Sequence, residues 1–175
     1  MDAIGNALGE ICKAVLPIPQ ESYRGNPESR VAVCTLSDIR LLESLAKPDV
    51  LGRVNIVGRL LSENRGIDAI LRYLYAHKRV RVVVVCGMDA RGHRAGHSLF
   101  RLHRHGVDRL VSNTASDPTT GKAFQNRISG SLSPDPHLAA SPEQIEHFRR
   151  NVTLVDMTGT SDRAQLVKSI IGQLQ

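Results

Sequence analysis

Hydrophobic and polar residues follow two patterns along this chain, and these patterns predict strands and helices in turn. Apolar runs of strand length occupy residues 30–36, 50–57, 80–86 and 151–157. Apolar residues at helical spacing occupy residues 3–16, 39–46, 64–77, 94–105 and 161–174, and Ser141-Pro142-Glu143 starts a further helix. Strands that alternate with helices of this length predict an α/β fold with a doubly wound, mainly parallel sheet and helices on both faces.

The same patterns predict how the chain is organised. Residues 1–24 are expected to form an N-terminal helix and a linker, because Pro17 and Pro19 end the first helical pattern. Residues 25–175 are expected to form one domain. Within it, residues 113–140 are rich in Ser, Thr, Asn, Gly, Asp and Pro, and they predict a long loop.

Composition narrows the functional classes. The 175 residues carry 23 Lys and Arg against 17 Asp and Glu, and the net charge of +6 favours an anionic partner. Three Tyr, three Phe and no Trp leave few rings on which bases could stack, so we expect no nucleic acid partner. A basic nucleic-acid-binding module, suggested by the arginines between Arg91 and Arg109, therefore ranks last among the alternatives.

Cysteine usage and hydropathy predict a cytoplasmic protein. Cys12, Cys34 and Cys86 lack C-x-x-C spacing, and we interpret them as small buried hydrophobic residues. No run approaches the ~20 apolar residues of a membrane span, and the N-terminus lacks the basic segment of a secretory signal. We therefore expect no membrane partner.

Three segments that follow predicted strands are candidates for ligand binding, because ligands of such sheets sit beyond the carboxyl ends of the strands. They are residues 34–37, 58–66 and 86–96. The third places Gly87, Gly92 and Gly96 around His93, as expected where backbone approaches a bulky ligand and an imidazole points at it. By spacing alone, a solvent-facing or capping role for this histidine is the more common outcome.

This segment matches neither of two known ligand-binding motifs. The glycines lack the spacing of a dinucleotide-binding G-x-G-x-x-G, and no glutamate follows His93 as in the zinc motif H-E-x-x-H. His97 lies one helical turn after His93, but no third zinc ligand is placed near them. The simpler interpretation of His97 is a solvated basic helix face shared with Arg94, Arg101 and Arg104.

Several strings resemble the A subunit of tetrahydromethanopterin S-methyltransferase. They are GNPESRVAVCTL at residues 25–36, SENRGI at 62–67, Cys86-Gly87 with Gly92-His93 and Gly96, and GVD at 106–108, in the order and spacing of that family. The resemblance implies a Rossmann-like domain that binds cobalamin or a related cobamide, with His93 as the axial ligand to cobalt. The family's membrane form ends in a transmembrane helix, and this chain ends at Gln175 without one, so we expect it to act outside a membrane complex.

The chemistry and positions of other residues at the strand ends also fit a corrin. Gly87, Gly92 and Gly96 would let the corrin approach the backbone, and Thr35, Ser37, Ser62 and Asn64 would hydrogen-bond its amides; helix capping is an equal alternative for these four. The related motif D-x-H-x-x-G has an aspartate two residues before its histidine, where this chain has Arg91. Whether Asp89 takes the place of that carboxylate is left open by the sequence.

The function predicted from the sequence is that of a corrinoid protein. It would carry a methyl group on cobalt from a methyl-pterin-dependent methyltransferase subunit to an acceptor, and it would not catalyse the transfer alone. The alternative is a cofactor-free regulatory or interaction domain of the same fold.

Overall fold

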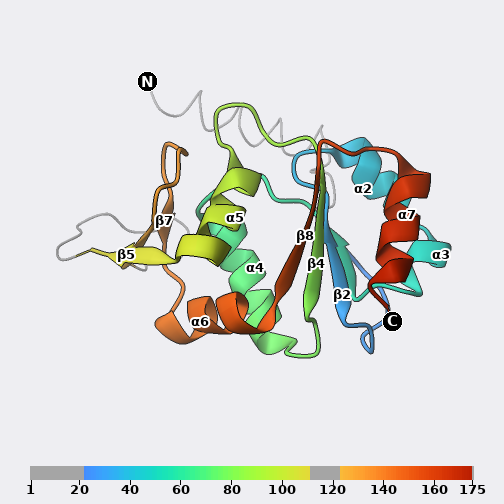
Figure 1. Ribbon diagram of the computed structural model, residues 1–175, viewed down its shortest axis with the longest axis horizontal. Helices are drawn as coiled ribbons and strands as arrows, with labels where there is room; N and C mark the ends of the chain where they lie inside the picture. The colour runs from blue at the N-terminus through green and yellow to red at the C-terminus, as the bar shows by residue number, and fades with distance from the viewer. Residues whose placement is uncertain (1–21, 111–122, 175) are drawn as a thin grey trace, which may run out of the picture.

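A five-stranded sheet forms the centre of the protein (Figure 1). The computed structural model describes residues 22–110 and 123–174. The strands are β1 (Ser22–Arg24), β2 (Val31–Cys34), β3 (Ile56–Gly58), β4 (Val82–Gly87) and β8 (Thr153–Thr158), in the order β1-β3-β2-β4-β8. Only β1 runs antiparallel to its neighbour. The protein is therefore a mixed α/β protein with a mostly parallel sheet, as its alternating pattern predicted.

Helices cover both faces of this sheet, as Figure 1 shows. On one face lie α4 (Arg65–Ala76), α5 (Ala95–His105) and α6 (Pro142–Asn151), and on the other lie α2 (Ile39–Leu45), α3 (Pro48–Leu51) and α7 (Arg163–Gly172). Each face packs its own hydrophobic core. Every residue of β2 and β4 is buried, which explains why both strands read as nearly unbroken apolar runs.

A second, three-stranded antiparallel sheet lies beside α5. It consists of β5 (Val107–Arg109), β6 (Asn126–Ile128) and β7 (His137–Leu138), in that order. Strands β6 and β7 fall within residues 113–140, where the sequence predicted a long loop, so that prediction is corrected for residues 123–140. Each strand has three residues or fewer and is flanked by Ser, Pro and Gly, so no periodic pattern develops, yet Ile128 and Leu138 are fully buried in the core.

Three other predictions change in detail. The strand expected at residues 50–57 is helix α3, a connection and the short β3, because Pro48 starts a helix that buries Val50. Asp38, not Ser37, caps α2 by accepting a hydrogen bond from the N–H of Leu41. Strand β1 begins inside the predicted linker, and the predicted helix at 3–16 lies outside the described residues.

Cys34 and Cys86 are buried, as the sequence predicted, and Cys12 lies outside the described residues. Burial raises the pKa of both thiols to about 12, so both are protonated at neutral pH. Among the helices of the described residues, none has the length and apolar character needed to cross a bilayer.

Asp68 of α4 forms hydrogen bonds with the segment that follows β7. Its carboxylate is buried, and its two oxygens accept hydrogen bonds of 2.9 Å from the backbone N–H groups of Ala139 and Ala140. The Asp68→Ala variant leaves both N–H groups without these acceptors, so we expect the free energy of unfolding to fall by about 3 kcal/mol. Urea denaturation measures this change. The control is Asp49→Ala, which removes an exposed carboxylate paired with Arg163 and should have a far smaller effect; equal effects would contradict the prediction.

Candidate functional site at the carboxyl edge of the sheet

The three segments singled out in the sequence meet at one edge of the sheet. Cys34 at the end of β2 pairs with Gly58 at the end of β3 and with Val85 near the end of β4. The segments are also joined directly: the Ser37 hydroxyl donates to the carbonyl of Met88 at 2.6 Å, and Arg59 Nη2 donates to the carbonyl of Ser37 at 3.0 Å. The register of parallel strands thus gathers residues 34–37, 58–66 and 86–96 into one surface, as predicted.

Backbone strain is concentrated in the same segments. Among the described residues, the non-glycine residues with positive φ are Leu36 at 51° and Arg94 at 48°. Leu36 follows β2, and Arg94 immediately precedes α5. Such conformations cost roughly 1–3 kcal/mol and cluster where function requires a particular geometry.

His93 in the loop before α5 is paired with a buried carboxylate. Its Nδ1 lies 3.0 Å from Oε2 of Glu63, which follows β3. The side chain of Glu63 is only 2% exposed, whereas that of His93 is 60% exposed. Because a carboxylate accepts hydrogen bonds, Nδ1 carries the proton in the neutral ring, and its N–H donates a hydrogen bond to Glu63 Oε2. The lone pair of the imidazole is therefore on Nε2, the nitrogen that remains available to a metal.

Glu63 is itself held by the turn between β6 and β7. Its second oxygen, Oε1, accepts a hydrogen bond of 3.1 Å from the backbone N–H of Asp135. The Asp135 carboxylate accepts from the side-chain amide of Asn64 at 2.8 Å and is paired with Nδ1 of His137. Both oxygens of Glu63 are thus occupied, and the orientation of His93 depends on the β6–β7 turn, which the sequence predicted as loop.

Asp89 does not take the place of the missing carboxylate. Its oxygens accept hydrogen bonds from the backbone N–H groups of Ala90, Gly96 and His97 at 2.9, 3.1 and 3.2 Å, at the start of α5. The carboxylate partner of His93 is Glu63, which sequence reasoning missed. A signal was present, because Glu63 lies between Ser62 and Asn64 in one of the three segments that were singled out.

The three glycines around His93 have different surroundings. A Cβ atom at Gly87 would lie 2.7 Å from the carbonyl oxygen of Thr35, and one at Gly96 would lie 2.9 Å from the Leu36 side chain. These two glycines therefore allow close packing within the protein. At Gly92, with φ of 89°, no atom of the described residues beyond its chain neighbours lies within 4 Å of the same position, so this part of the described surface is open next to His93.

Nearly the whole sequence is similar to that of a known protein family. The model of the family described as the A subunit of tetrahydromethanopterin S-methyltransferase matches residues 13–174. The chain belongs to this family.

Individual members of this A-subunit family are similar over most of the chain. The A subunit of the putative methyltransferase Mtx of Methanosarcina acetivorans is 30% identical over 155 residues, which are 88% of this chain and 67% of the relative. The tetrahydromethanopterin S-methyltransferase A subunit 2 of Methanothermobacter thermautotrophicus is 35% identical over 139 residues, 79% of this chain and 66% of the relative. The chain therefore spans about two thirds of the length of these relatives.

The four polar residues that the sequence suggested as cofactor contacts make hydrogen bonds within the protein. Asn64 caps α4 by accepting from the N–H of Arg65 at 2.7 Å, and Ser62 accepts from the N–H of Gly66 at 2.9 Å. Ser37 joins two loops, and Thr35 is fully buried against the carbonyl of Gly58. Helix capping, the alternative weighed for these four residues, is thus what Ser62 and Asn64 do.

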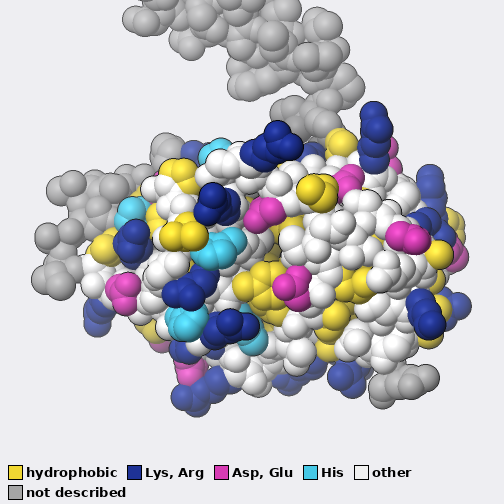
Figure 2. Space-filling model, turned by 45° about the horizontal axis from the view of Figure 1, so that its top comes forward, with side chains coloured by type: hydrophobic (Ala, Val, Ile, Leu, Met, Phe, Trp, Pro, Cys, Tyr) yellow, Lys and Arg dark blue, Asp and Glu magenta, His cyan; other side chains and the backbone are white. Residues whose placement is uncertain are grey.

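His97 differs from His93 in its surroundings. Its Nδ1 is buried and has no hydrogen-bond partner within residues 22–110 and 123–174. Burial lowers the pKa of His97, and the guanidinium groups of Arg101 and Arg94 lower it further. Figure 2 shows Lys, Arg and His side chains gathered on the left of the view. Of the predicted basic face, Arg94 and Arg104 are exposed, whereas His97 and Arg101 are half-buried. Among the described residues there is no group of three or more His, Cys, Asp or Glu that could hold a metal ion by itself.

Exposed apolar side chains come from the same edge of the sheet. Leu61 follows β3, Met88 follows β4, and Leu132 lies in the β6–β7 turn. That turn touches the segment after β4, because the Ser133 hydroxyl donates to the carbonyl of Arg94 at 3.3 Å. The edge that carries His93 therefore offers apolar as well as polar contacts.

Proposed function

We propose that this chain binds cobalamin or a related cobamide with His93 Nε2 as the axial ligand to cobalt, and that it carries a methyl group in this form. The observation that carries the proposal is the hydrogen bond between His93 Nδ1 and the buried Glu63 carboxylate. A metal-binding histidine commonly donates its other ring N–H to a carboxylate, which fixes both the tautomer and the direction of the ring.

The residues present fit such a cofactor. A corrin ring already supplies the equatorial nitrogens of its cobalt, so the protein has to provide only one imidazole. The open surface at Gly92 leaves room beside His93, and Leu61, Met88 and Leu132 offer apolar contacts to a broad ring. When bound, the cobalt of this cofactor supplies a centre that accepts a methyl group and releases it again.

The task of the protein's own residues is to hold and orient the imidazole. Glu63 keeps the proton on Nδ1, and Asp135 and Asn64 keep Glu63 in place. The relatives are named as methyltransferase subunits, so we propose that the partner delivering the methyl group is a methyl-pterin-dependent methyltransferase subunit. We also propose that the sheet and its helices form a Rossmann-like, doubly wound domain.

A cofactor-free regulatory or interaction domain is the second candidate. It is favoured by the polar residues at the sheet edge, because Ser37, Ser62 and Asn64 already make hydrogen bonds within the protein. If these side chains keep their present partners, fewer groups are left to bind corrin amides.

The test uses cobinamide, a corrinoid that lacks the nucleotide base, so any nitrogen ligand to its cobalt must come from the protein. The full chain is mixed with cobinamide and freed of excess, and electron paramagnetic resonance is recorded in the Co(II) state. We expect a superhyperfine triplet from one axial nitrogen, which becomes a doublet when histidine is labelled with ¹⁵N.

The matched variants are His93→Ala and His97→Ala. We expect His93→Ala to lose the nitrogen splitting and His97→Ala to keep it, because only His93 has an exposed imidazole oriented by a carboxylate. A nitrogen signal that persists in His93→Ala contradicts the ligand assignment. A wild-type chain that retains no corrinoid favours the cofactor-free domain.

A further inference from the structure

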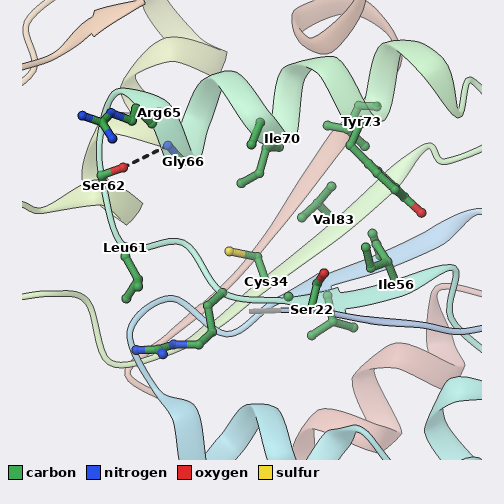
Figure 3. Close-up of a pocket in the computed structure, with 16 residues that line it drawn as sticks. Ser22, Cys34, Ile56, Leu61, Ser62, Arg65, Gly66, Ile70, Tyr73 and Val83 are labelled. Atoms are coloured by element: carbon green, nitrogen blue, oxygen red, sulfur yellow. Dashed lines mark hydrogen bonds between the residues drawn. The ribbon is translucent and has the colours of Figure 1, made fainter. Parts of the chain in front are cut away.

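A cavity of about 490 Å³ lies between the central sheet and α4 (Figure 3). Its volume falls within the range of roughly 300–1,000 Å³ that is usual for small-molecule sites. It is lined by β2, β3 and α4, and it extends from the carboxyl edge of the sheet toward Tyr73. The cavity shares Leu61 with the surface around His93, whereas His93 itself does not line it.

The walls of the cavity are mostly apolar. They include Ala32, Cys34, Ile56, Ile70, Leu74 and Val83. The Cys34 thiol is protonated, since burial raises its pKa to about 12, and it behaves here as a small apolar group. This part of the cavity favours an apolar group.

One end of the cavity carries positive charge. Arg59 and Arg65 both line it, and Figure 3 shows Arg65 at the end where Leu61 and Ser62 lie. Arg59 donates one hydrogen bond, from Nη2 to the carbonyl of Ser37. Among the described residues, its buried Nε has no hydrogen-bond partner and no carboxylate forms an ion pair with it.

A buried guanidinium nitrogen without a partner is costly, because it has lost water and gained no acceptor. An anionic oxygen would supply the missing acceptor, and such charge-assisted hydrogen bonds are stronger than neutral ones. We propose that the cavity binds an amphipathic anion, with its apolar ring among Cys34, Ile70 and Val83 and its anionic group at Arg59.

Two sources share this chemistry. One is a free aromatic acid. The other is the nucleotide tail of a cobamide, which joins an aromatic base to a phosphodiester, and this second source alone rests on the proposed function.

The test uses anilinonaphthalene sulfonate, a fluorescent aromatic anion, titrated into the full chain. We expect saturable binding that the Arg59→Gln variant weakens about tenfold, because a charge-assisted hydrogen bond is lost. The matched control is Arg72→Gln, which removes an exposed arginine of α4 outside the cavity. Equal affinities of the two variants would overturn the proposal.

A second pair of variants tests the cavity itself. Ala69 is exposed and lines the cavity, so Ala69→Trp should obstruct it without disturbing the core, and we expect binding to weaken by at least about tenfold. Ala164→Trp on α7 adds the same ring on the opposite face of the sheet and should bind like the wild type. Thermal denaturation confirms that both variants fold. Unchanged binding by Ala69→Trp would also overturn the proposal.

Competition between the fluorescent probe and corrinoids shows which of the two anions the cavity binds. If the cavity takes a nucleotide tail, cobalamin displaces the probe and cobinamide does not. If it takes an independent anion, probe and cobalamin bind together. Probe binding by His93→Ala should equal that of the wild type, so failure of the cobalt-ligand proposal and failure of the cavity proposal give different results.

Discussion

Replacing Glu63 by glutamine should weaken corrinoid binding by about ten- to hundredfold, the usual cost of losing an outer partner of a metal-binding histidine. The carboxylate uses both oxygens, one for His93 Nδ1 and one for the N–H of Asp135. A glutamine has one acceptor oxygen, and its amide N–H₂ then faces a second donor. The variant therefore loses either the hydrogen bond to His93 Nδ1 or the hydrogen bond to the N–H of Asp135 in the β6–β7 turn.

The decisive measurement needs no cofactor. In the wild type, ¹⁵N NMR of the histidine rings should show His93 protonated on Nδ1, and Glu63→Gln should populate the other tautomer. The control is Glu43→Gln, an exposed glutamate of α2, which should change neither the tautomer nor the affinity for cobinamide. If Glu63→Gln keeps the wild-type tautomer and affinity, the positioning role of Glu63 is wrong.

The Gly87→Ala variant should lower the free energy of unfolding by about 4 kcal/mol, from backbone strain of about 1–2 kcal/mol and a steric clash of similar or larger size. Gly87 has φ of 75°. Its new Cβ atom would lie 2.7 Å from the Thr35 carbonyl oxygen and 2.9 Å from Cβ of Asp38. Both neighbours belong to the packed junction between β2 and α2 and cannot move aside without cost.

Gly92→Ala is the matched control, because Gly92 also has positive φ but has open space where the Cβ would go. We expect a loss of only about 1 kcal/mol from the backbone conformation. Urea denaturation at neutral pH measures both variants. Similar losses would show that Gly87 is needed for its backbone conformation alone and not for close packing.

The regular elements could be predicted from sequence because their signals are local. Strand β4 is a long β-branched run, and α5 has apolar residues at helical spacing with Gly106 at its end. The short strands β6 and β7 could not be predicted, since two or three residues show no periodicity. Their formation depends on burying Ile128 and Leu138 against distant helices and on the contacts of Asp68 with the following chain.

The candidate site, too, could be predicted only in part from the sequence. His93 and the three segments around the sheet edge were found from sequence, because strand ends and glycine-rich turns are visible there. Glu63 was not assigned, since it lies 30 residues before His93. The two side chains can meet because β3 and β4 are strands of the same parallel sheet, so the segments that follow them lie at the same edge.

By itself, the sequence determined that this is an α/β protein of the A-subunit family with a histidine at the carboxyl edge of its sheet. Only the tertiary structure decided which carboxylate orients that histidine. It also showed that Asp89 accepts hydrogen bonds at the start of α5 and that Gly87 and Gly96 are needed for close packing. It also revealed a cavity lined by Arg59, whose Nε has no hydrogen-bond partner in the described part of the chain. The physical reason is that hydrophobic periodicity acts within one element, whereas hydrogen bonds and cavities depend on residues that strand order brings together.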